Sequence, residues 1–297
     1  MKKLFVLFLI ILLSLPAIGQ AKKMRTRLYC SLSNVEIEDY LSRNDIIIIP
    51  VGPIEVNGGN PVDCEYVGPL AYAIKIAEKV DGLVLEHMIP VYPGGTSIGR
   101  GTIYLDPSEN TKYLKLIATS LLRQGFKTQI YITGHGPSPS FMDPFVFEFL
   151  QETKVPILHM SMGNIASKLT LDTKSEMRST MYGAYSIVGR LNDIPLSFEG
   201  ISQPGLADYK PMQPPVSLLK KVNDNYPTAF YYNSQYDHGG VPKDITAAEV
   251  DRLAKLGVAY INEVVDKMDA PALVNALKVH QKYIQDMVKK HGDLLPK

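Results

Sequence analysis

Short runs of branched apolar residues alternate with amphipathic stretches along most of the chain. The most continuous apolar run, 46–49, is stopped by Pro50 and Gly52, as expected of a central parallel strand that is covered on both faces. Similar runs predict three further strands. These are Leu83-Val84-Leu85, Gln129 to Thr133, and Val155-Pro156-Ile157-Leu158.

Helical patterns fill the spaces between these runs. One helix is predicted from about 67 to 80, and a second over 106–125, where Asp106 can cap, proline suits the first turn and glycine stops the helix. The pattern of a capping box begins another helix over 246–265. A last, Lys-rich helix is predicted at about 270–291.

Strands that alternate with helices predict an α/β fold, a three-layer αβα sandwich with a mostly parallel central sheet. We expect residues 20–297 to form one such domain. The segment 202–226, rich in Pro, Lys and Asn, is predicted to be a long loop of the kind that often covers a site. Ligand sites in these sheets lie just past the carboxyl ends of the strands, so the search for chemistry begins there.

The first residues, 1–19, have the pattern of a secretory signal peptide. Lys2 and Lys3 precede an apolar run over 4–15, and small residues follow before Gln20. This run is shorter than the roughly 20 residues that span a bilayer. We therefore expect the mature chain to be exported, to the periplasm or the medium, without a retained membrane span.

Charge and cysteine content narrow the range of partners. The 31 Lys and Arg residues nearly balance the 30 Asp and Glu residues, and no basic stripe stands out, which argues against a nucleic-acid partner. A small-molecule partner is expected instead. Cys30 and Cys64 could pair in an exported chain, but one bridge does not make a disulfide scaffold, and their pairing stays open.

Two glycine-flanked turns that directly follow predicted strands carry the candidate chemistry. The first holds Glu55 and Asn57 and leads to Glu65, and the second holds His135. Two carboxylates and an imidazole at one sheet edge could hold a divalent cation with an open coordination position. The alternative is a purely structural role, in which the glutamates cap the next helix and the histidine donates a hydrogen bond to a loop carbonyl. No compact His-x-x-x-His or Cys-x-x-Cys pair decides between the two.

Several ordered motifs resemble those of the creatininase (creatinine amidohydrolase) family. Pro50-Val51-Gly52 followed by Glu55-Val56-Asn57-Gly58 is similar to its Pro-Val-Gly and Glu-x-His-Gly turn, and Thr133-Gly134-His135-Gly136 is similar to its Asn-Gly-His motif. Further matches extend the resemblance over most of the mature chain. They are Pro90-Val91-Tyr92-Pro93-Gly94, Gly101-Thr102-Ile103-Tyr104-Leu105, Gly125-Phe126, and Gly239-Gly240-Val241-Pro242.

The resemblance implies ligands for one of the two metal ions that family members hold. Glu55 matches the carboxylate of the first ion and His135 matches its histidine. Glu65 falls at the bridging aspartate of the family if one residue is deleted here, and Asp63 is the alternative. Glu55, Glu65 and His135 are thus expected to bind a divalent ion, zinc or manganese.

The second ion of the family has lost its ligands in this sequence. Its histidine is Asn57 here, and the glutamate two residues past the later histidine is Pro137. We therefore expect one ion rather than two, with Asn57 orienting substrate or water. The family's proton-transfer segment is not recoverable around 181–186. His238 could supply a catalytic imidazole from another loop, although a structural role suits it as well.

Three functions stay open at this point. The first is a metal-dependent hydrolase of the creatininase type, which acts on an amide or cyclic amide C–N bond of a small molecule. The second is a catalytically degenerate scaffold that binds a small molecule or a protein partner, because Asn57 and Pro137 are poor ligands. The third, a nucleophilic hydrolase that uses Ser138 or Cys64, lacks a Gly-x-Ser-x-Gly elbow. The resemblance also implies a homo-oligomer, commonly a ring-like hexamer.

Overall fold

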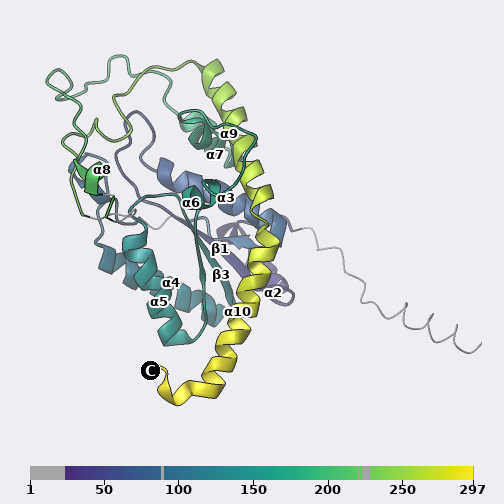
Figure 1. Cartoon of the computed structure of the whole chain (residues 1–297). Coiled ribbons are helices and arrows are strands. Elements are labelled where there is room, and N and C mark those ends of the chain that lie inside the picture. Colours follow the sequence, from purple (N-terminus) through teal and green to yellow (C-terminus); the bar gives the residue numbers. More distant parts are fainter. Residues whose placement is uncertain (1–23, 88–89, 220, 223–227, 297) are drawn as a thin grey trace, which may run out of the picture.

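The computed structural model describes residues 24–87, 90–219, 221–222 and 228–296 and has a parallel four-stranded sheet at its centre (Figure 1). The spatial order of the strands is β2-β1-β3-β4. Their bounds are β1 (Ile46–Val51), β2 (Leu83–Val84), β3 (Thr128–Thr133) and β4 (Leu158–Ser161). The signal peptide predicted for residues 1–19 lies outside the described residues. Within the described ranges, no helix has the length and apolarity needed to cross a membrane.

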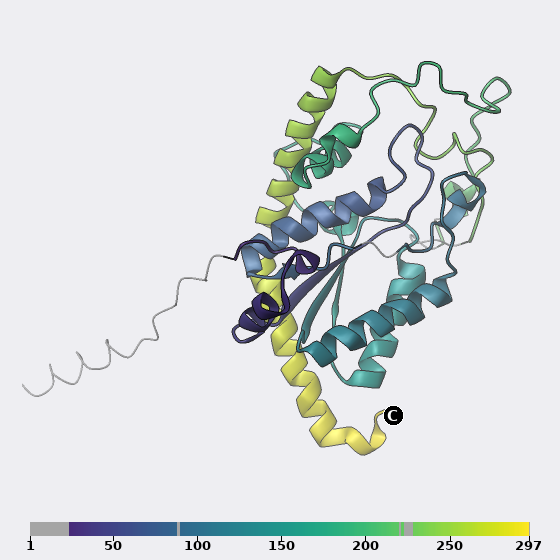
Figure 2. The same cartoon turned by 180° about the vertical axis from the view of Figure 1, so that it is seen from behind.

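The central strand β1 is buried on both faces, because its alternate residues belong to two separate hydrophobic cores. Ile46 and Ile48 pack with helices on one face, and Ile47, Ile49 and Val51 pack with helices on the other. Three layers result, as Figures 1 and 2 show. The predicted αβα sandwich with a parallel sheet is therefore confirmed.

Helices from both halves of the chain build these outer layers. The first face is covered by α3 (Cys64–Val80), α7 (Ser179–Ile187), α9 (Ala247–Lys267) and part of α10 (Ala270–His291). The second face is covered by α2 (Asn34–Leu41), α4 (Pro107–Gln124) and α5 (Pro139–Thr153). The shorter helices are α6 (Met162–Ala166) and α8 (Val216–Leu219), with single turns η1 (Tyr29–Ser31), η2 (Gly94–Ile98), η3 (Leu191–Asp193) and η4 (Gly292–Leu294).

Two local expectations were wrong in detail. The fourth strand begins at Leu158, which pairs with Ile130, and not at Val155. The proline at 156 has no N–H to donate to a ladder, so it disfavours an earlier start. Asp106 precedes α4 as expected, but its side chain does not cap the helix and accepts a hydrogen bond from Tyr104 Oη instead, at 3.0 Å.

Helices α7 and α9 cross with backbone nearly touching backbone. A Cβ atom placed on Gly257 would lie 1.8 Å from the carbonyl oxygen of Ser179, and one on Gly183 would lie 2.3 Å from the carbonyl carbon of Gly257. Only glycine permits this approach. The crossing holds α9 against the layer that contains α3, whose first turn supplies Glu65.

Candidate metal centre

The turn after β1 places Glu55 beside the start of α3. Gly52 makes this possible, since a Cβ atom there would lie 2.5 Å from the carbonyl oxygen of Glu65. The loop is closed by the amide of Glu55, which donates to the carbonyl oxygen of Val62 at 2.9 Å. Glu55 is fully buried as a result, and it faces Glu65 in the first turn of α3.

His135 lies at the carboxyl end of β3, the strand next to β1, and contacts both carboxylates. Its Nδ1 atom lies 2.6 Å from Glu65 Oε2 and 3.4 Å from Glu55 Oε1. The three residues expected to share a cation therefore meet in space, although 80 residues separate the first from the last. Their convergence follows from the parallel sheet, because the ends of β1 and β3 lie side by side.

His238 reaches the same carboxylates from a loop near the start of α9. Its Nε2 atom lies 3.2 Å from Glu65 Oε1 and 3.5 Å from Glu55 Oε1. Two glycines allow this loop to touch the turn after β1. A Cβ atom on Gly58 would lie 2.5 Å from the carbonyl oxygen of Gly239, and both glycines have positive φ angles, 56° and 75°.

Asn57 completes the cluster. Its Nδ2 atom donates to Glu65 Oε1 at 3.1 Å and lies 3.1 Å from His238 Nε2, while its Oδ1 accepts from Asn60 at 2.9 Å. The structure thus brings together all five residues singled out from the sequence. They are Glu55, Asn57, Glu65, His135 and His238.

The two carboxylates have opposite electrostatic environments. Burial raises the pKa of Glu55, and the charge of Glu65 adds to this effect against the opposing influence of the imidazoles. Burial also opposes ionisation of Glu65, but hydrogen bonds to His135 and His238 outweigh it and hold the pKa of Glu65 below its usual value. Burial lowers the pKa of His238, yet its two carboxylate partners prevail and raise that pKa to about 9.

The donor set fits a divalent cation. Glu55, Glu65 and His238 each place one ligand atom within 4.8 Å of the other two. Glu55 Oε1 and His135 Nε2 are buried and make no hydrogen bond in the described part of the chain, a costly arrangement unless a further partner is present. Carboxylate oxygens and imidazole nitrogens are ligands of zinc and manganese. The two carboxylates and the two imidazoles of the cluster line a cavity of about 240 Å³ that leaves room for a small ligand.

Asp63, the alternative to Glu65, points elsewhere. Its carboxylate accepts hydrogen bonds from Tyr185 Oη and Arg190 Nη1, both at 2.6 Å. It therefore ties the start of α3 to α7 and the segment after it. Of the two acidic residues, the one that contacts the histidines is Glu65.

The residues proposed for a nucleophilic mechanism lack activation. Ser138 Oγ is buried and makes no hydrogen bond among the described residues, so no base holds it. Cys64 is buried, and burial raises the pKa of its thiol. Cys30 is exposed, and both cysteines are free, so they do not pair in this structure.

A second group of metal-type ligands lies away from this cluster. Cys30, Glu86 and His87 each offer a ligand atom within 4.8 Å of the others, but the cysteine and the histidine are exposed. Glu86 accepts a hydrogen bond from the amide of Cys30 at 3.1 Å. Measurements of bound metal need to separate this surface group from the buried cluster.

Comparison with known proteins agrees with the fold and the motifs. The sequence profile of the creatininase family (creatinine amidohydrolase) matches residues 31–184, more than half of the chain. The chain therefore belongs to the creatininase family. A search of curated proteins returned no match.

Solved structures of creatininases share the fold at low sequence identity. A putative creatinine amidohydrolase from Bacteroides fragilis NCTC 9343 is 15% identical, with a TM-score of 0.55, and the match covers 86% of this chain and 96% of that one. A manganese form of creatininase is 17% identical, with a TM-score of 0.54 and coverage of 81% and 98%. A zinc–zinc form of a creatininase variant is 17% identical, with a TM-score of 0.51 and coverage of 82% and 98%.

Proposed function

We propose that the protein is a metal-dependent hydrolase that cleaves an amide-type C–N bond of a small molecule. Glu55, Glu65, His135 and His238 would hold one divalent ion, zinc or manganese. Two of the creatininases that share the fold are a manganese form and a zinc–zinc form, which supports this choice of metals. Family membership supports the reaction class.

One observation carries the proposal. Glu55 Oε1 is buried and has no hydrogen-bond partner among the described residues, and it lies 3.4 Å and 3.5 Å from nitrogen atoms of two histidines. A buried carboxylate oxygen left in this state is expensive unless a cation completes its surroundings. Glu65 directs one oxygen to each histidine, so its carboxylate spans the cluster.

Residues around the proposed ion would orient its ligands for hydrolysis. A divalent ion in such a site polarises a carbonyl group and lowers the pKa of water towards neutrality. Asn57, whose amide contacts Glu65 and His238, would orient these two ligands of the ion. Thr96 Oγ1 is hydrogen-bonded to Glu55 Oε2, which fixes the orientation of that carboxylate.

A chelator experiment on purified protein tests the proposal. The protein is screened against linear and cyclic amides, including creatinine, before and after chelator treatment and after addition of zinc or manganese. We expect hydrolysis that disappears with the chelator and returns with the metal. Glu55→Gln should abolish it, whereas Glu38→Gln on the exposed side of α2 should leave it unchanged.

Elemental analysis separates this proposal from a scaffold that only binds. A scaffold of this kind is favoured by Pro137, a poor ligand at the position that the resemblance matches to a glutamate of creatininase. The Cys30→Ser substitution removes the thiol of the surface group, so the metal content is measured in that background. About one ion per chain that Glu55→Gln removes supports the metal centre, and metal without hydrolysis of any amide supports the scaffold. No ion in the Cys30→Ser protein would overturn the metal centre itself.

Export and self-association are also proposed. The signal-peptide pattern of residues 1–19 supports export, and amino-terminal sequencing of secreted protein tests it. Family membership supports a homo-oligomer, which we propose to be a hexamer, and light scattering of the purified chain tests that state.

A further inference from the structure

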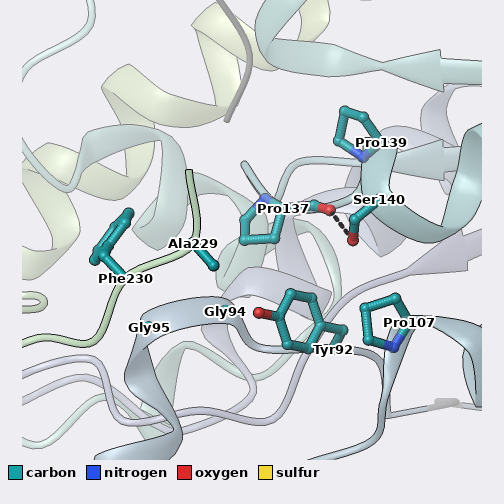
Figure 3. A pocket seen from close by; sticks show the side chains of 9 residues that line it. All are labelled: Tyr92, Gly94, Gly95, Pro107, Pro137, Pro139, Ser140, Ala229 and Phe230. Carbon is teal, nitrogen blue, oxygen red and sulfur yellow. Dashed lines mark hydrogen bonds between the residues drawn. The ribbon is translucent and has the colours of Figure 1, made fainter. Parts of the chain in front are cut away.

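A second cavity adjoins the candidate metal centre, and its walls are mostly nonpolar rings (Figure 3). Its volume is about 400 Å³, within the range of small-molecule sites. Among the residues that the structure describes, those that line it carry no charged side chain. The rings and the methyl group that form its walls belong to Tyr92, Pro107, Pro137, Pro139, Ala229 and Phe230.

The two cavities share walls. Gly95, Pro137 and Phe230 line both the nonpolar cavity and the cavity that contains Glu55 and Glu65. A row of aromatic rings extends from this wall to the metal centre. Phe230 packs edge-on against Tyr232, with ring centroids 5.3 Å apart, and Tyr232 lies at the same centroid distance from His238. The two cavities are therefore direct neighbours.

Close backbone contacts hold these walls in place. A Cβ atom on Gly94 would lie 2.7 Å from Pro137 Cγ, and one on Gly95 would lie 2.9 Å from the ring of Phe230. The amide of Tyr232 donates to the carbonyl oxygen of Gly95 at 3.1 Å. The cavity is preformed, which reduces the entropy lost when a ligand binds.

The cavity offers little to an anion, although the first turn of α5 borders it. The amides of that turn are already used, because Ser140 N donates to Pro137 O at 3.0 Å and Met142 N donates to Ser138 O at 2.9 Å. The hydroxyl of Ser140 donates to Pro137 O as well, at 2.8 Å (Figure 3). The opening residues of α4 and α5, Pro107 and Pro139, have no N–H at all.

We propose that the substrate carries a compact, uncharged nonpolar group, a ring or a branched alkyl group, next to the scissile amide. This group binds in the cavity between Tyr92, Pro137 and Phe230 while the amide lies at the metal centre. The inference rests on the proposed function and narrows it to amides of nonpolar acids or amines. Burial of a ring among these side chains should increase affinity about tenfold or more over a methyl group.

Binding of two hydroxamates to the zinc-loaded chain tests this inference by calorimetry. Both probes carry the same metal-binding head, so benzohydroxamate and acetohydroxamate differ only in the nonpolar group. We expect benzohydroxamate to bind about tenfold more tightly or better. Ser140→Asp places a carboxylate at the wall of the cavity and should bring the ratio close to one. Ser108→Asp is the same change in the first turn of α4 but lies outside the cavity lining. It should leave the ratio of the two hydroxamate affinities unchanged.

Benzamide and acetamide, measured by saturation-transfer NMR on chelator-treated protein, make the result independent of the metal. We expect transfer to benzamide alone, and its loss in Ser140→Asp. If neither hydroxamate binds, the proposed metal centre is contradicted. The benzamide result still tests whether the cavity binds a nonpolar group. Equal affinity of the two hydroxamates, no preference for benzamide, or a preference that survives Ser140→Asp would overturn the inference.

Discussion

His238 Nε2 lies 3.2 Å from Glu65 Oε1, a contact between residues 173 positions apart in the sequence. The other oxygen of the same carboxylate contacts His135 Nδ1 at 2.6 Å. Glu65 thus joins two imidazoles from different loops. This geometry places His238 among the metal ligands that we propose.

Replacement of His238 by alanine should weaken metal binding. Loss of one of four ligands, and of a contact to Glu65, is expected to lower zinc affinity about tenfold to a hundredfold. Competition with a chromogenic chelator in the Cys30→Ser background measures this change. His280→Ala on the exposed side of α10 is the control. Unchanged zinc affinity in His238→Ala would assign that residue to substrate contact or structure instead.

Replacement of Asp63 by asparagine should affect stability and not metal binding. Its carboxylate accepts hydrogen bonds from Tyr185 and Arg190, and loss of the charge weakens both. We expect the free energy of unfolding to fall by roughly 1–3 kcal/mol, as judged by urea denaturation. Zinc affinity should stay within about twofold of the wild type, because Asp63 points away from the centre. A large loss of zinc affinity with unchanged stability would reverse the roles of Asp63 and Glu65.

The convergence of Glu55 and His135 could be expected from sequence, for a physical reason. Each follows a short, mostly apolar run that predicts a buried strand, and the ends of neighbouring parallel strands lie together. The position of His238 had no such signal. It depends on contact between Gly58 and Gly239, and a long-range approach of two loops leaves no local periodicity in the sequence.

Helix α5 was overlooked although its sequence contained a signal. Phe141, Phe145 and Phe149 recur every four residues and are all fully buried on one face of the helix. The prolines at 139 and 144 obscured this pattern. Proline is compatible with the first turn, and Pro144 lies one turn further in, where it removes one hydrogen-bond donor.

The stability contributed by Glu263 should depend on pH. Hydrogen bonds from Lys267 and from the amides of Asp172 and Thr173 lower the pKa of its carboxyl group to about 2. A lowered pKa means that this contribution is present above the ordinary value of 4.5 and is lost as pH falls towards 2. Glu263→Gln should therefore lower the urea midpoint at pH 7, and the difference from wild type should narrow at pH 3.

The exposed Glu38→Gln variant serves as the control for that comparison and should shift the midpoint little at either pH. A Glu263→Gln deficit of the same size at pH 3 and pH 7 would contradict the ionic origin of the contribution. It would point instead to the shape of the side chain.

The crossing of α7 and α9 should tolerate no side chain at Gly257. A Cβ atom there would lie 1.8 Å from the carbonyl oxygen of Ser179, a backbone atom that cannot move without shifting α7. We expect Gly257→Ala to lower the free energy of unfolding by about 3 kcal/mol, since overpacking a helix contact forces backbone shifts. Urea denaturation followed by circular dichroism measures the change.

Gly163→Ala in α6 is the control for this prediction. It is also a helical glycine, but a Cβ atom there would meet nothing within 4 Å, and no proline follows it. Alanine favours the helix over glycine, so this variant should gain up to about 1 kcal/mol. The two substitutions are chemically identical and should have opposite signs. If Gly257→Ala were also stabilising, the two helices would have to lie farther apart than this structure places them, and the position of α9 against α3 would need revision.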